Sequence, residues 1–211
     1  MSLVLNDYYM IIVGTILELL IVCVFTYALA QTRWLHSTVN GKLNPQNCVI
    51  LIATFAILAI MATTYFSFNY IDNTKISVRD FPAMISGLIG GPVVGICVGL
   101  IGGLERYFVG GPTAIPCMMG TIFAGLAGGI IWYIGGKKFP KFYIAAIAML
   151  IVEFIHMISI YYLSDTVSRE PSGMDIASTI APAMIICNVL CILVFSIIYK
   201  RIIEPNIKYK E

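Results

Sequence analysis

The fold is decided by the stretch Ser77–Gly136, which reads SVRDFPAMISGLIGGPVVGICVGLIGGLERYFVGGPTAIPCMMGTIFAGLAGGIIWYIGG. It holds fifteen of the 18 glycines of the chain, and five of them recur at every fourth position: Gly87, Gly91, Gly95, Gly99 and Gly103. A four-residue repeat of small residues lines one helix face and lets helix backbones approach closely inside a membrane. The stretch therefore predicts tightly packed membrane helices.

A Gly90-Gly91-Pro92 sequence lies within this repeat, about midway between Arg79 and Arg106. Proline has no N–H group, and its ring prevents a helix from continuing through this point. We therefore predict two short helices, 80–90 and 93–107, joined by a tight turn. Such a hairpin returns both arginines to the same side of the membrane.

The composition places the whole chain in a membrane, since 59% of its residues are hydrophobic and 11% are charged. Several apolar runs exceed ~18 residues, the length at which a membrane-spanning helix is expected. We predict an all-α, polytopic helical bundle forming a single transmembrane sensor domain over 1–211, with a core at 48–200 and an extra N-terminal helix at 8–30. A net charge of +2 is too small to indicate nucleic-acid binding. The predicted helices are 8–30, 48–70, 80–90, 93–107, 116–134, 142–163 and 176–199.

Orientation follows from the distribution of lysine and arginine, which favours the cytoplasmic side. Seven helices place nine basic residues on one side and four on the other, and six helices give the same count. Without Arg79 and Arg106 the division is nine to two for seven helices and eight to three for six. We therefore expect seven helices, a multi-pass protein of the plasma membrane, and a cytoplasmic C-terminus.

The hairpin predicts a small-anion pocket where Arg79, Arg106 and the start of helix 116–134 meet near the outer face. Guanidinium groups offer paired donors that match a carboxylate. Cys117 and Thr121 lie four residues apart on that helix and would add a thiol and a hydroxyl group. The alternative is that both arginines are interfacial anchors, reaching the headgroups or pairing with Asp80 and Glu105.

Glu153 and His156 are three residues apart and so share one helix face. A metal centre of this type needs a second such pair, and the only other histidine, His36, lies in a predicted loop. We expect a polar pair that faces the bundle interior, with Glu153 balancing an arginine, and neither a metal nor a cofactor. The sequence contains no nucleotide-binding or nucleophile motif, so we do not expect an enzyme.

The glycine-rich stretch also resembles the LytS/YhcK-type five-transmembrane receptor domain, strongly over about 60 residues and weakly over about 180. The matching residues are Arg79-Asp80, Gly87-Leu88, Gly90-Gly91-Pro92, Gly95, Gly99-Leu100, Gly103, Arg106-Tyr107, Gly110-Gly111, Thr113-Ala114, Cys117, Thr121 and Ala124-Gly125-Leu126. In that family the domain is the membrane input module of histidine kinases and diguanylate cyclases. Its best understood members resemble receptors for pyruvate.

The resemblance implies four ligand positions, because the family binds its ligand with two arginines, a cysteine and a serine. They fall on Arg79, Arg106, Cys117 and Gly120, of which Gly120 departs from the family because it has no hydroxyl group. Thr121 and Thr113 are the candidate substitutes.

Two further departures lie beside the arginines. Ser77 stands where the family favours asparagine, and Glu105 stands where it favours histidine. The expected effect of Glu105 is to neutralise Arg106 and weaken anion binding.

The resemblance implies a receptor domain in the lipid bilayer that binds a small carboxylate such as pyruvate and passes the signal to a cytosolic module. A homodimer is the expected signalling form. The short helix, Gly-Pro turn and returning helix also resemble the substrate-binding subunits of energy-coupling-factor vitamin transporters. A small-solute carrier is therefore the alternative, and a structural membrane protein without a ligand is the third.

Overall fold

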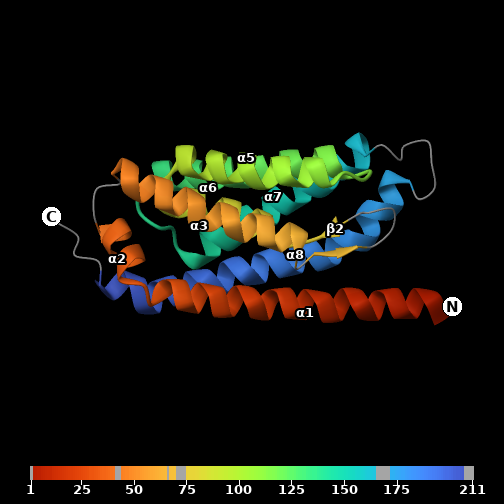
Figure 1. Cartoon of the computed structure of the whole chain (residues 1–211), viewed down its shortest axis with the longest axis horizontal. Coiled ribbons are helices and arrows are strands. Elements are labelled where there is room, and N and C mark those ends of the chain that lie inside the picture. Colours follow the sequence, from red (N-terminus) through yellow and green to blue (C-terminus); the bar gives the residue numbers. More distant parts are fainter. Residues whose placement is uncertain (1, 41–43, 66, 70–74, 165–171, 207–211) are drawn as a thin grey trace.

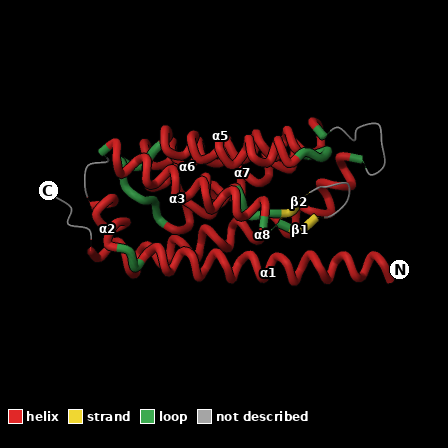
Figure 2. Tube along the Cα trace, in the orientation of Figure 1, coloured by secondary structure: helices red, strands yellow, loops and turns green. Residues whose placement is uncertain are grey.

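The computed structural model describes residues 2–40, 44–65, 67–69, 75–164 and 172–206. It is an all-α bundle, with the start of α1 and the end of α8 at opposite ends of its long axis (Figure 1). Two short strands, β1 (Phe68–Asn69) and β2 (Lys75–Ile76), pair antiparallel at one side (Figure 2). The helices are α1 (Ser2–Ala30), α2 (Arg33–Asn40), α3 (Pro45–Thr64), α4 (Asp80–Gly90), α5 (Pro92–Val109), α6 (Ala114–Ile134), α7 (Phe142–Leu163) and α8 (Gly173–Ile198), followed by a π-helical turn (Tyr199–Ile203) and a 3₁₀ turn (Glu204–Asn206).

Within the described residues, six helices are long and apolar enough to cross a membrane. Helix α4 has 11 residues and is about 16 Å long, roughly half the thickness of a bilayer core. The seven predicted helices thus correspond to six long helices and one half-length helix, which confirms the predicted fold class. The six long segments are Ile12–Ala30, Pro45–Thr64, Pro92–Val109, Ala114–Ile134, Phe142–Leu163 and Gly173–Ile203.

The predicted hairpin is present, and its break is at Gly91. This residue has φ = 85°, a left-handed conformation that glycine adopts without strain. Its N–H donates to the carbonyl of Gly87 at 2.8 Å, which closes α4. Pro92 then begins α5, where a missing N–H group costs nothing.

The repeated glycines bring the hairpin against α6. A Cβ atom on Gly95 would lie 2.1 Å from the carbonyl oxygen of Gly125, and one on Gly99 would lie 2.8 Å from the Cα atom of Ile122. Real Cβ atoms do not approach other atoms so closely, so any larger residue would push the helices apart. The glycine repeat therefore sets the distance between α5 and α6, as the sequence predicted.

Helix α4 lies at the centre of the bundle, where it contacts α3, α5, α6 and α8. Every residue from Asp80 to Ile89 is buried. Phe81 packs edge-on against Phe195 of α8, with their ring centroids 6.2 Å apart. The residues at the start of α4 are consequently held inside the protein.

Two predicted boundaries were wrong. The predicted helix 48–70 ends at Thr64, because Ser67 and Lys75 both donate to the carbonyl of Thr63 and so replace the helical hydrogen bonds there. Its predicted end at 70 lies outside the described residues. The predicted loop 31–47 contains α2, and α3 starts at Pro45 because Asn44 caps it through a 2.8 Å bond from the Asn47 N–H.

Candidate ligand-binding site

Arg79 is buried at the start of α4, with 1% of its surface exposed. Its Nε donates to the hydroxyl of Thr121 at 2.8 Å, and its Nη1 donates to the hydroxyl of Thr63 at 3.1 Å and to that of Ser77 at 3.4 Å. Three elements therefore hold one guanidinium: α3, α6 and the segment before α4. The burial rules out an anchor that reaches the headgroups.

Arg106, in the last turn of α5, is fully buried as well. Its two terminal nitrogens donate to the carbonyl of Gly110 and, at 2.9 Å, to the hydroxyl of Thr113. Its Nε atom is buried without a hydrogen-bond partner among the described residues. Arg79 packs beside Gly102, one turn before Arg106, so the hairpin brings the two arginines into one region.

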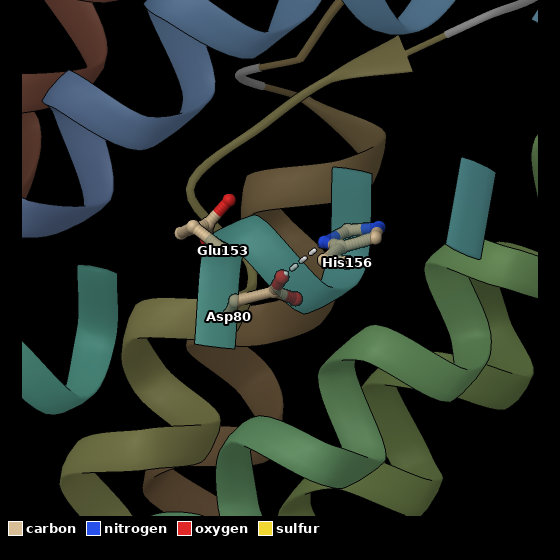
Figure 3. A group of neighbouring side chains, drawn as sticks. All are labelled: Asp80, Glu153 and His156. Atoms are coloured by element: carbon tan, nitrogen blue, oxygen red, sulfur yellow. Dashed lines mark hydrogen bonds and ion pairs between the residues drawn. The ribbon is translucent and has the colours of Figure 1, made fainter. Parts of the chain in front are cut away.

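Asp80 connects Arg79 to α7 through side-chain hydrogen bonds. The Thr121 hydroxyl, which accepts from Arg79, donates to Asp80 Oδ1 at 2.6 Å. The other carboxylate oxygen of Asp80 lies 2.7 Å from Nδ1 of His156 and forms an ion pair with it when the imidazole is protonated (Figure 3). Residues from α4, α6 and α7 thus form one connected polar network, which runs Arg79–Thr121–Asp80–His156.

Glu153 faces the bundle interior, as predicted, and so does His156. The carboxylate of Glu153 lies beside Asp80 and His156 (Figure 3), and its expected role of balancing an arginine stays a prediction. One ligand-type atom from each of these three residues lies within 4.8 Å of the other two. Both carboxylate oxygens of Glu153 are buried without a partner in the described part of the chain.

Cys117 and Gly120 lie on the first turns of α6 and face this network. Cys117 is fully buried, and its backbone carbonyl oxygen lies 2.9 Å from the hydroxyl of Thr121. A Cβ atom on Gly120 would lie 2.6 Å from the ring of His156. The missing side chain at 120 therefore provides the space that the imidazole occupies.

The two threonines named as substitutes for the family's serine are both at the candidate site, and each forms a hydrogen bond with a different arginine. Thr121 bonds to Arg79, and Thr113 bonds to Arg106. Glu105, by contrast, accepts a 2.9 Å hydrogen bond from Thr64, and the described residues contain no ion pair between it and Arg106.

Three structural partners of the site are not predicted from the sequence: Asp80, Thr63 and Ser77. Asp80 was considered only as a neutralising neighbour of an arginine. No local pattern links it to His156, which is 76 positions away along the chain. A buried acid directly after a buried arginine, at the start of a short helix, is the one available signal.

This geometry defines the class of protein: a helical membrane domain that buries two arginines in a polar region. The family model for the 5TMR of 5TMR-LYT matches residues 32–202. The chain belongs to this family, which confirms the resemblance drawn from the glycine-rich stretch.

Curated relatives share this domain. The sensor protein LytS of Bacillus cereus is 34% identical over 172 residues, which cover 74% of this chain and 28% of the relative. The sensor histidine kinase BtsS of Escherichia coli is 45% identical over 84 residues, covering 40% and 14%. The sensor histidine kinase/phosphatase LytS of Staphylococcus aureus is 27% identical over 212 residues, covering 90% and 34%. The aligned parts span about a third or less of these relatives, and no solved structure matches the chain.

Proposed function

We propose that this chain is a membrane receptor domain that binds a small carboxylate such as pyruvate and passes the signal to a cytosolic module. The observation that carries the proposal is the burial of both arginines in one polar region of a sensor-family domain. Charged residues at membrane depth are costly and are usually functional. Relatives named as sensor proteins and sensor histidine kinases support the signalling role.

In this proposal Arg79 and Arg106 clamp the carboxylate, and Cys117 and Thr121 contact the rest of the ligand. Both guanidinium groups are fixed by neutral hydroxyl or carbonyl partners, so their charge remains available to an anion. The free Nε of Arg106 offers an unused donor. A carboxylate accepts paired hydrogen bonds from arginine better than from lysine.

The proposal includes an orientation and a domain organisation. The C-terminus is cytoplasmic, because Lys137, Lys138, Lys141, Lys200 and Arg201 follow the ends of α6 and α8. The chain is one sensor unit over 1–211, with a core at 48–200 and a homodimer as the signalling form. Its added N-terminal helix, expected at 8–30, is α1 (Ser2–Ala30). Labelling of single cysteines placed at Lys138 and Phe108 in intact cells tests the orientation, and external labelling at Lys138 contradicts it.

Titration calorimetry of the solubilised chain with pyruvate and related short carboxylates tests the binding. We expect Arg79→Ala and Arg106→Ala each to weaken binding about tenfold to a hundredfold, because each removes a charge-assisted contact. Arg201→Ala is the matched control, since this arginine is exposed beyond the end of α8. Binding that survives both site substitutions unchanged contradicts the site.

A carrier is distinguished from a receptor by transport. Proteoliposomes that contain the chain should bind the carboxylate without accumulating it. Accumulation against a gradient would favour the alternative drawn from vitamin-transporter subunits.

A further inference from the structure

A cavity of about 410 Å³ lies where α7 begins and α8 ends. Its walls come from the segment before α7, the first turn of α7, the end of α8 and the two short turns that follow α8. The apolar span of α7 starts at Phe142, and that of α8 ends at Ile203. The cavity is therefore at one edge of the membrane-spanning region, at the depth of the lipid headgroups.

Aromatic stacking holds the walls of this cavity together. The ring of Phe139, before α7, stacks on the ring of Tyr199 after α8, with centroids 4.1 Å apart and an angle of 21° between the planes. The same ring lies 5.9 Å from that of Phe195. Lys141 is two residues from Phe139, and Lys200 directly follows Tyr199. The stacked pair thus holds the two backbone segments that carry these lysines next to each other.

The cavity has a net positive charge. Lys141 and Lys200 both line it with exposed side chains, and neither forms an ion pair among the described residues. The Nζ atom of Lys141 lies 5.9 Å from the centroid of the Tyr143 ring, a second lining residue, which keeps the ammonium group beside the cavity. Glu204 is the one acidic residue of the lining, so two positive charges face one negative charge. This balance favours an anion.

The surface next to the cavity is apolar and exposed. Tyr143 and Ile147 are four residues apart on α7 and share one helix face, and both are exposed. On a membrane-spanning helix such a face contacts lipid chains. A molecule with its phosphate in the cavity can lay acyl chains along this face, which a soluble phosphate cannot do.

We propose that the cavity binds the headgroup phosphate of an anionic phospholipid. Lys141 and Lys200 donate to the phosphate from two elements, and the N-terminus of α7, which has no side-chain cap, adds partial positive charge. The acyl chains lie along Tyr143 and Ile147. Basic pockets between membrane helices bind headgroups of this kind. The site goes beyond the carboxylate receptor and does not depend on it.

The test is native mass spectrometry of the full chain in a nonionic detergent, titrated with phospholipids that differ only in the headgroup. Phosphatidylglycerol is anionic, phosphatidylcholine is zwitterionic, and phosphatidylethanolamine is zwitterionic with an ammonium group that can pair with Glu204. We expect phosphatidylglycerol to bind at least about fivefold more tightly than the other two, because the cavity has a net positive charge. An excess of inorganic phosphate or glycerol phosphate should not displace it.

Two pairs of variants locate the binding in the cavity. Lys141→Gln and Lys200→Gln should each weaken phosphatidylglycerol binding about fivefold and change phosphatidylcholine binding by less than about twofold. Lys137→Gln and Arg201→Gln are the matched controls, since they remove the same charge from neighbouring positions that do not line the cavity. Both controls should keep the phosphatidylglycerol affinity within about twofold of wild type. Thermal unfolding without lipid checks that each variant is folded, and the wild-type lipid panel decides independently of the variants.

Three outcomes overturn the inference. Equal binding of the three phospholipids means that the cavity does not select an anionic headgroup. An equal loss in the cavity variants and in their controls means that diffuse charge, and not this cavity, attracts the lipid. Displacement of phosphatidylglycerol by inorganic phosphate or glycerol phosphate means that the ligand is a soluble phosphate.

Discussion

The two halves of α6 are built in opposite ways. In its second half, Gly125 and Gly129 lie directly against the backbone of the hairpin, with no side chain between the helices. In its first half, Cys117 and Thr121 belong to a buried polar network that contains unpaired atoms. One helix thus combines close backbone packing along its second half with a polar network along its first half, in which some hydrogen-bonding groups are unpaired. The first half is thus the one that the proposed ligand site uses.

The largest expected effect is on the glycine half. A Cβ atom on Gly125 would lie 2.0 Å from the carbonyl oxygen of Gly95, so Gly125→Ala should separate the helices and destabilise the domain by about 3 kcal/mol, the upper end of the usual cost of overpacking. The apparent melting temperature in detergent should fall by at least about 6 °C. Ala53→Val, on an exposed face of α3, adds volume without a close neighbour and should shift it by less than about 2 °C. A stable Gly125→Ala protein would show that the glycine contact is dispensable.

The second prediction concerns lysine in place of each arginine in the polar half. Arg79 uses two nitrogens for three hydroxyl partners, and an ammonium group cannot reproduce that geometry. Calorimetry should show about tenfold to a hundredfold weaker carboxylate binding in Arg79→Lys and Arg106→Lys. Arg201→Lys is the control and should bind as wild type does. Equal affinity in all three variants would mean that positive charge alone suffices.

The third prediction concerns Gly120, a position where the two kinds of contact meet because it is a glycine that lies beside the polar network. Gly120→Ala should displace the imidazole of His156, which would lie 2.6 Å from the new Cβ atom. Breaking the His156–Asp80 contact should weaken ligand binding about tenfold, equivalent to roughly 1.4 kcal/mol. The double variant Gly120→Ala/His156→Ala lacks the imidazole, so the clash is absent. Its loss of unfolding free energy should therefore differ from the sum of the two single-variant losses by at least about 0.5 kcal/mol. Additive losses would place the imidazole elsewhere.

The smallest effect is expected at Glu105, at the margin of the polar half. Glu105→Gln should keep an acceptor for Thr64 and change carboxylate affinity by less than about twofold, because Glu105 makes no ion pair with Arg106 within the described residues. A rise of tenfold or more in affinity would restore the sequence-based expectation that Glu105 neutralises Arg106.

Much of this architecture follows from the sequence alone. Apolar runs long enough to cross a bilayer core indicate helices, because a helix pairs its backbone groups within the segment and lipid offers them no partners. Gly90-Gly91-Pro92 requires a break, and the four-residue glycine repeat requires a close neighbour along one face. The turn at Gly91 and the backbone contact of Gly95 with Gly125 are therefore local consequences of composition and spacing.

The tertiary structure alone decided how the polar groups are paired. The bond between Asp80 and His156 joins positions 76 apart, and no periodic pattern records such a contact. Likewise, Glu153 lies near Asp80 and His156 because the fold of the bundle brings side chains from α4 and α7 together. Hydrophobic periodicity specifies which face of a helix is buried, whereas the partner of a buried polar side chain depends on how the helices are placed relative to one another.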